Sequence, residues 1–327
     1  GGNADESGQE SVANVVARFF SFVALLVLIG VASFRWLTIP SANRISARHS
    51  RAQSLGASRD LMLARSARLG SVAAVLLLAA AIVRSYLESY AIHGATDAMK
   101  SAMLRSMLFE TTWGNAWLVQ VGAALLAGIA LALVSAAAVQ GRRGTPWWTI
   151  ATVSIIVLAF TPAFGGHAVA SPRLRSLAVL SDGLHVLGAG GWLGTLLIVV
   201  AVGLPIVLSA TAPDRGGMAA DLINAFSPAA LAFASLIVLT GVGAAWLHIG
   251  SWATLWRSAY GRALLIKIGV LLPVIGTGAY NWLRIRPVLG DVAAAHRLRR
   301  SATMELIIGS AVVLVTAVLV ALQTPIE

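Results

Sequence analysis

Two histidines lie on either side of one short loop between apolar segments, and they are the residues of this chain best suited to hold a metal ion or a cofactor. His167 ends the apolar segment that begins at Trp147, and His185 lies inside the next apolar segment. An ionisable residue within a membrane span is costly, so it normally marks an ion path, a ligand site or a buried pair. We therefore expect the two imidazoles to approach each other and form a metal or cofactor site.

Asp182 precedes His185 by one helical turn, so a helix would place both side chains on one face. The carboxylate has three roles open to it. It can bind a metal directly, accept a hydrogen bond that orients His185, or form an ion pair with Lys267 of a later span. Small residues follow, including Gly190 and Gly191, and they allow a neighbouring helix to approach closely. We expect Asp182 to lie within reach of His185, Lys267 or both.

Further possible ligands lie near the same end of the apolar segments. His93 and His248 are near segment ends, where the alternative is a side chain at the membrane interface. Met99, Met103 and Met107 recur every four residues; thioether sulfur suits Cu(I), and the alternative is the apolar face of an interfacial helix. The candidate metal ligands are therefore His167, His185, Asp182, His93, Met99, Met103 and His248.

The composition places the chain among membrane proteins. Hydrophobic residues make up 58% of the 327 residues and charged residues only 11%, which is too apolar for a soluble domain of this size. The chain has no cysteine, which excludes disulfides and Cys-x-x-Cys metal motifs. It has no P-loop motif, so ATP is not expected as its energy source. The net charge of +11 fits basic cytoplasmic loops, and no nucleic-acid partner is expected.

Apolar runs of about 20 residues predict the elements, because that length spans a bilayer as a helix. The predicted fold is all-α, a polytopic membrane bundle of eight transmembrane helices. Residues 1–11 form a polar periplasmic tail or linker, residues 12–323 the membrane domain, and residues 324–327 a short C-terminal tail. Since the chain opens on Gly1, we expect it to be processed or cut from a longer protein. The spans are 12–37, 69–90, 113–138, 147–168, 177–209, 224–248, 261–282 and 302–323.

The distribution of arginine predicts the orientation. Most arginines lie in the segments that follow the first, third, fifth and seventh spans. Cytoplasmic loops collect Arg and Lys, so both termini are expected in the periplasm. His49 and His296 fall in the Arg-rich segments and are expected to be solvated. Glu305, near the start of the last span, is expected to pair with Arg284 as a structural contact.

A series of short motifs runs in order from the fourth span to the end of the chain. No single motif is specific, but together they cover more than half the chain. They comprise Gly166-His167-Ala168, Asp182-x-x-His185 with Trp192-Leu193-Gly194, Phe226-Ser227, Thr240-Gly241 with Trp246, Tyr260-Gly261-Arg262 with Lys267, Ala279-Tyr280-Asn281 with Arg284, Arg299-Arg300-Ser301 with Glu305, and Thr324-Pro325. In this order they resemble the CopD family of bacterial copper-resistance and copper-uptake membrane proteins.

The resemblance implies an eight-helix protein of the bacterial inner membrane that moves copper from the periplasm inwards and is not an enzyme. The family often works with CopC, a periplasmic copper-binding β-sandwich. In fused proteins that module precedes the first span, and the polar residues 1–11 fit such a junction. The expected partners are therefore a copper ion, a CopC-like protein or domain, and the lipid bilayer.

Two other functions remain open on the residues alone. Two histidines on adjacent helices can be the axial ligands of haem b, which would make the chain a membrane redox protein. The chain could also be a copper sensor or an assembly subunit that does not transport. The copper permease is the leading hypothesis, with His167 and His185 holding copper near the outer face.

Overall fold

The computed structural model of the chain describes residues 12–94, 96–142, 144–164, 175–211, 214–249, 252–286 and 290–322. Eight helical segments are long and apolar enough to cross a membrane, which confirms the predicted all-α bundle. They are Val12–Arg48, Ala52–His93, Thr112–Val139, Thr145–Phe164, Ser176–Ser209, Arg215–Ala245, Ala259–Ile285 and Val292–Leu319.

Several spans combine α-helical stretches with short π-helical turns, which are labelled η. The first span is α1 (Val12–Ser33), η1 (Phe34–Thr38) and α2 (Ile39–Arg48). The fifth span is α7 (Arg175–Ala189), η3 (Gly190–Gly194), α8 (Thr195–Ile198), η4 (Val199–Gly203) and α9 (Leu204–Ser209). The remaining elements are α3 (Ala52–His93), α4 (Ser101–Glu110), α5 (Thr112–Val139), α6 (Thr145–Phe164), α10 (Arg215–Ile249), α11 (Trp252–Arg257), α12 (Ala259–Tyr280), η5 (Asn281–Ile285) and α13 (Val292–Leu319).

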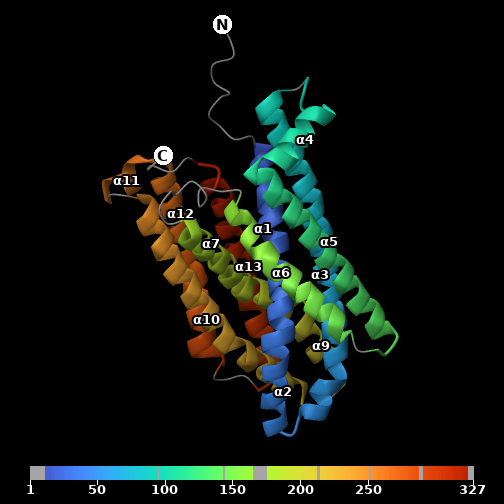
Figure 1. Ribbon diagram of the computed structural model, residues 1–327. Coiled ribbons are helices and arrows are strands. Elements are labelled where there is room, and N and C mark those ends of the chain that lie inside the picture. The colour runs from blue at the N-terminus through green and yellow to red at the C-terminus, as the bar shows by residue number, and fades with distance from the viewer. Residues whose placement is uncertain are drawn as a thin grey trace.

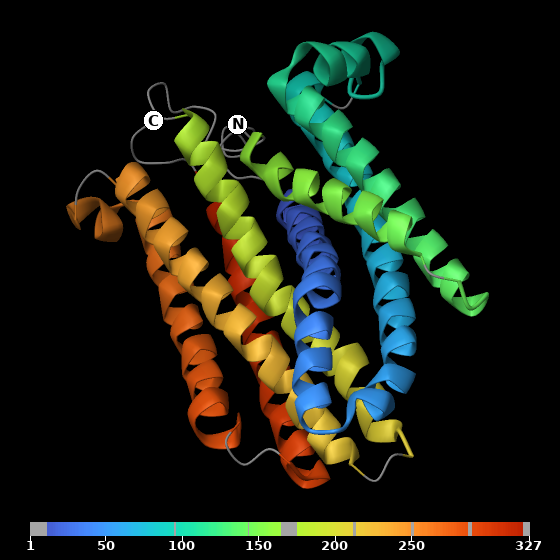
Figure 2. The same ribbon diagram turned by 60° about the horizontal axis from the view of Figure 1, so that its bottom comes forward.

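Helix α1 runs through the middle of the bundle (Figures 1 and 2). It packs on α3 and α6 on one side and on η3, α8 and α13 on the other. Helix α5 packs on α3 and α6, and α10 packs on α7. Helix α12 lies at the margin and packs mainly on α13 and α11. The first half of the chain therefore meets the second half along α1, and also where α6 packs on α7 and α2 packs on α10.

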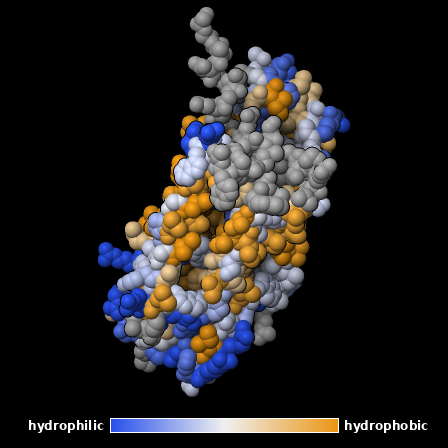
Figure 3. Space-filling view, turned by 90° about the vertical axis from the view of Figure 1, so that its left-hand side faces the viewer, coloured by the Kyte–Doolittle hydropathy of each residue, from blue (hydrophilic) through white to orange (hydrophobic). Residues whose placement is uncertain are grey.

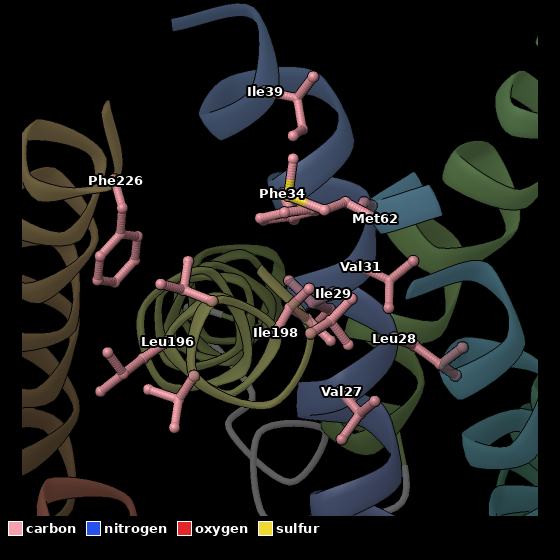
Figure 4. Packing of buried hydrophobic residues seen from close by; sticks show 14 of the residues in the cluster. Val27, Leu28, Ile29, Val31, Phe34, Ile39, Met62, Leu196, Ile198 and Phe226 are labelled. Atoms are coloured by element: carbon pink, nitrogen blue, oxygen red, sulfur yellow. The ribbon is translucent and has the colours of Figure 1, made fainter. Parts of the chain in front are cut away.

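Two glycines allow α1 and η3 to cross at close range. A Cβ atom added to Gly30 would collide with the backbone of Gly194, and one added to Gly194 would collide with the carbonyl oxygen of Leu26. Around this crossing lies the apolar core, where α8 directs Leu196 toward Phe226 of α10 and Ile198 toward α1 (Figure 4). Small residues in this position are the usual means of close helix packing in membranes.

The first Arg-rich segment is helical, and its prediction as a loop was wrong. Helices α2 and α3 extend past the membrane-spanning stretch and meet at a tight turn around His49 to Arg51. A buried carboxylate, Asp221 of α10, holds this turn: it accepts from Arg51 Nε at 2.9 Å and from Ser46 Oγ at 2.7 Å. The hydrogen bond with Asp221 raises the pKa of Arg51. His49 is half-exposed, but its Nδ1 also lies 3.0 Å from Asp221 Oδ1, so it is not simply solvated.

The surface matches a bilayer environment. Figure 3 shows a broad hydrophobic belt across the middle of the molecule, with hydrophilic residues at the ends and most densely at the lower end. The lower end carries α2 and the starts of α3, α10 and α13 (Figure 1). The arginines of those elements therefore gather on one side of the belt, as the sequence predicted for loops on one membrane face.

Candidate functional site

His185 projects from α7 onto α10. The imidazole is partly buried, and its Nδ1 lies 2.9 Å from Thr240 Oγ1. The Thr240 hydroxyl donates its proton to the carbonyl oxygen of Leu236 at 2.7 Å, so its oxygen is left to accept from the His185 Nδ1–H. A Cβ atom added to Gly241 would lie 3.6 Å from His185 Cε1, so the ring rests on bare backbone of α10. With Nδ1 as the donor, the lone pair lies on Nε2, the form in which imidazole binds a metal. The backbone of Ile237 is a further hydrogen-bond partner of the ring.

Charged side chains of α7 and α12 interact near His185. Asp182 lies one turn before His185 on α7 and interacts electrostatically with Lys267 and Tyr260 of α12. Lys267 also interacts electrostatically with His185. Asp182 and Lys267 are therefore near enough for their charges to interact. The carboxylate offsets the ammonium charge that would otherwise repel a metal cation from the imidazole.

Two of the predicted ligands cannot be compared with this geometry. His167 lies outside the described residues. His248 belongs to the last turn of α10, but its side chain is also outside the described part of the chain. The predicted approach of His167 to His185 stays a prediction.

His93, Met99 and Met103 lie elsewhere. His93 ends α3, and its Nδ1 lies 3.2 Å from the carbonyl oxygen of Ser89 in the preceding turn. Met99 is 67% exposed and belongs to the turn before α4, whereas Met103 lies within α4. Met99 therefore does not belong to the helix that carries Met103 and Met107, and the three methionines do not share one helix face. Helix α4 lies on the α3–α5 side of the bundle, away from α10 and α12 (Figures 1 and 2).

A second polar position lies further along the fifth and seventh spans than His185 and Lys267, where these spans pack on α13. Glu305 of α13 is only 4% exposed. Its Oε2 accepts from Asn281 Nδ2 of η5 at 3.3 Å, and the side chain of Trp192 in η3 is a further hydrogen-bond partner. The expected pairing of Glu305 with Arg284 was wrong, because Arg284 is exposed on η5. The signal in the sequence was an acidic residue inside an apolar span.

The donor set near His185 is small. Within the described ranges, no group of three or more His, Asp, Glu or Cys residues could hold a metal ion. His185 and Asp182 thus supply at most two protein ligands from the described residues. The best-defined pocket in the described part lies elsewhere, between α1, α3, α5 and α6; Arg84, Gln120 and Trp117 contribute to its lining, and these are not copper-binding side chains.

Comparison with known proteins gives the family. The model of the copper resistance protein D-like N-terminal domain matches residues 9–175, and the model of copper resistance protein D matches residues 220–319. The chain is 30% identical over 258 residues to the copper transport protein CutJ of Bacillus subtilis, covering 79% of this chain and 46% of CutJ, so it spans about half the length of that relative.

A second relative matches over almost its whole length. The chain is 24% identical over 309 residues to copper resistance protein D of Pseudomonas syringae pv. tomato, covering 91% of this chain and 92% of that protein. No solved structure matches the chain. The two family models together extend over most of the eight helices, and the chain belongs to the copper resistance protein D (CopD) family of membrane proteins.

Proposed function

We propose that the chain transports copper across the bacterial inner membrane, from the periplasm toward the cytoplasm. Two relatives are named as a copper transport protein and a copper resistance protein. The observation that carries the proposal is the environment of His185. A partly buried imidazole is held by Thr240 with Nε2 left as the ligand nitrogen, beside an acid–base pair that balances its own charge.

Copper chemistry favours this position over the others. Imidazole binds both Cu(I) and Cu(II), and the chain has no cysteine that could compete as a ligand. The hydrogen bond at Nδ1 fixes the tautomer and the ring orientation, which is how metal-ligating histidines are normally held. We propose that His185 is the inner ligand and that His167 joins it from the preceding segment. Asp182 acts chiefly by compensating Lys267.

The proposed orientation follows from charge. The arginines of α2, the start of α3 and the start of α13 gather at one end of the bundle, and that end is expected in the cytoplasm. His185 then lies in the outer half of the membrane, where copper arrives. His93, Met99, Met103 and His248 are proposed to collect copper on the periplasmic side. A CopC-like protein or domain is the proposed donor.

Copper stoichiometry on the purified protein tests the site. Wild type should bind copper, His185→Ala should lose most of that binding, and His167→Ala should lose less, because water more easily replaces the shallower ligand. His296→Ala is the matched control, since His296 is exposed on α13 at the opposite end. Undiminished copper binding in the double variant would rule the site out. A Soret band that disappears in either variant would assign the pair to haem b instead.

A further inference from the structure

Glu305 has an unusual position for an acidic residue. Its side chain is buried in α13 against α12 and η3, at 4% exposure. Along α7 and η3, Trp192 follows His185 by seven residues, so this position lies about 10 Å further from the outer surface than His185. A carboxylate at that depth is costly, and residues of this kind inside spans are normally functional.

Both hydrogen-bond partners of Glu305 belong to π-helical turns. Asn281 is the first residue of η5, and Trp192 is the central residue of η3. π-Helical turns within α-helices are rare and frequently occur at functional sites. On α12, a Cβ atom added to Gly278 would lie 3.6 Å from Glu305 Oε1, so bare backbone faces the carboxylate there. Two local departures from α-helix thus converge on one acidic group.

The surroundings do not form a metal site. Asn281 and Trp192 present N–H donors to the carboxylate, and both are neutral. No salt bridge to Glu305 occurs among the described residues, and no cluster of three metal-ligating side chains includes it there. On η5, Arg284 is exposed, and the following Arg286 donates to Asn224 Oδ1 at 2.7 Å. On α13 itself, Arg300 is exposed and Arg299 is partly buried, five and six residues before Glu305. Lys267 lies about 21 Å from Asn281 along its helix.

Asn281 also offers an acceptor that nothing uses. This residue is 9% exposed, and its Oδ1 is buried without a hydrogen-bond partner. A buried amide oxygen without a partner is costly. If Glu305 is protonated, its O–H can donate to that oxygen after rotation of the amide, whereas the ionised form accepts from the NH2 group. The same side chain can therefore satisfy Glu305 in both protonation states.

We propose that Glu305 takes up and releases one proton in each transport cycle and so couples copper movement to proton movement. This inference rests on the proposed transport of copper. The proton moves between water and a Glu305 carboxylate oxygen, and no other bond changes. Copper binding at His185 is a separate event at a separate depth, so removing the carboxyl group should abolish coupling without abolishing binding.

Reconstituted proteoliposomes test the proposal. Copper uptake is measured over a pH series and under an imposed pH gradient, with a pH-sensitive dye in the lumen. Wild type should show pH-dependent uptake accompanied by a change of lumenal pH. In Glu305→Gln both the pH dependence and the lumenal pH change should be lost, while copper stoichiometry stays at the wild-type value. Glu110→Gln, an exposed acid on α4, should behave as wild type.

The outcomes are distinguishable. One outcome is that wild type takes up copper and that Glu305→Gln keeps the wild-type pH profile and proton movement. That outcome would overturn the coupling and leave the transport function standing. Absence of copper uptake by wild type would instead overturn the transport function. If Glu305→Gln does not fold, the same measurements are made on Asn281→Leu. That substitution removes the amide group next to Glu305 and keeps a side chain of similar size. A shifted pH profile in that variant supports the proposal, and an unchanged profile contradicts it.

Discussion

The hydrogen bond from His185 Nδ1 to Thr240 Oγ1 is the contact on which the copper site depends most closely. It joins α7 to α10, and the backbone of Ile237 on α10 is a further hydrogen-bond partner of the imidazole. The Thr240 oxygen is available only because its own proton goes to a carbonyl one turn earlier. The Thr240 hydroxyl therefore helps to orient the imidazole as a ligand.

Thr240→Val should lower copper affinity by about 10- to 100-fold, the range found when a group that orients a metal ligand is lost. Valine has nearly the same shape as threonine, so the packing of α7 on α10 should survive. Thr240→Ser keeps the hydroxyl and should bind copper almost as wild type does. Equilibrium copper titration of the three proteins provides the comparison, and equal affinities for valine and threonine would contradict the assigned role.

Asp182→Asn should weaken copper binding by about tenfold, because it leaves the charge of Lys267 uncompensated beside His185. The double variant Asp182→Asn with Lys267→Met removes both charges and should recover most of the affinity. A double variant as weak as the single one would mean that Asp182 ligates copper directly. The measurement is the same titration.

At the scale of elements, the crossing of α1 and η3 holds the two halves of the chain together. Gly30 and Gly194 meet backbone to backbone, and the fifth span has the highest share of buried residues among the eight candidate spans of the described chain. Trp192, two residues before Gly194 in η3, is also a hydrogen-bond partner of Glu305. The crossing therefore positions both the core and the deeper polar site.

Gly30→Ala should destabilise the protein by about 1–3 kcal/mol, the usual cost of an oversized side chain in a packed core. The added methyl group meets backbone atoms of Gly194, which cannot move without shifting the helix. Gly122→Ala in α5 is the matched control, since a Cβ atom there meets nothing within 4 Å. Thermal unfolding in detergent should show a lower Tm for the first variant only, and equal values would contradict the proposed crossing.

At the scale of the whole molecule, the charge asymmetry predicts the orientation in the membrane. The chain has no cysteine, so single cysteines can be introduced and labelled in intact cells with a membrane-impermeant maleimide. Ser101→Cys at the start of α4 should be labelled, and Gln53→Cys at the start of α3 should not be. Both positions are exposed. The reverse pattern would place the termini in the cytoplasm and His185 in the inner half of the membrane.

The eight spans could be predicted because a bilayer requires long apolar runs, and the chain provides them. The polar extensions of these spans could not be predicted from the sequence. The segment from Arg44 to Arg68 has the composition of a loop, yet it is helical, because α2 and α3 pair with each other and Asp221 binds the turn between them from α10. That partner lies about 170 residues away in sequence and is visible only in the folded chain.

The polar side chains were predictable in type but not in pairing. Asp182 and Lys267 interact electrostatically, as the similar depth of their positions indicated. Glu305 was expected beside Arg284, but helix rotation and the π-helical turn η5 present Asn281 to it instead. In a regular α-helix residues three apart share one face, but η5 begins at Asn281 and a π-helical turn has a longer period, so Arg284 does not follow Asn281 on the same face.

Copper uptake into proteoliposomes tests the central claim most directly. Wild type, His185→Ala and His296→Ala are reconstituted in parallel, and copper is added outside at a fixed concentration. The account predicts uptake by wild type and by His296→Ala, and uptake near the rate of empty vesicles for His185→Ala. Uptake by His185→Ala at the wild-type rate would contradict the claim that copper passes through the site on α7.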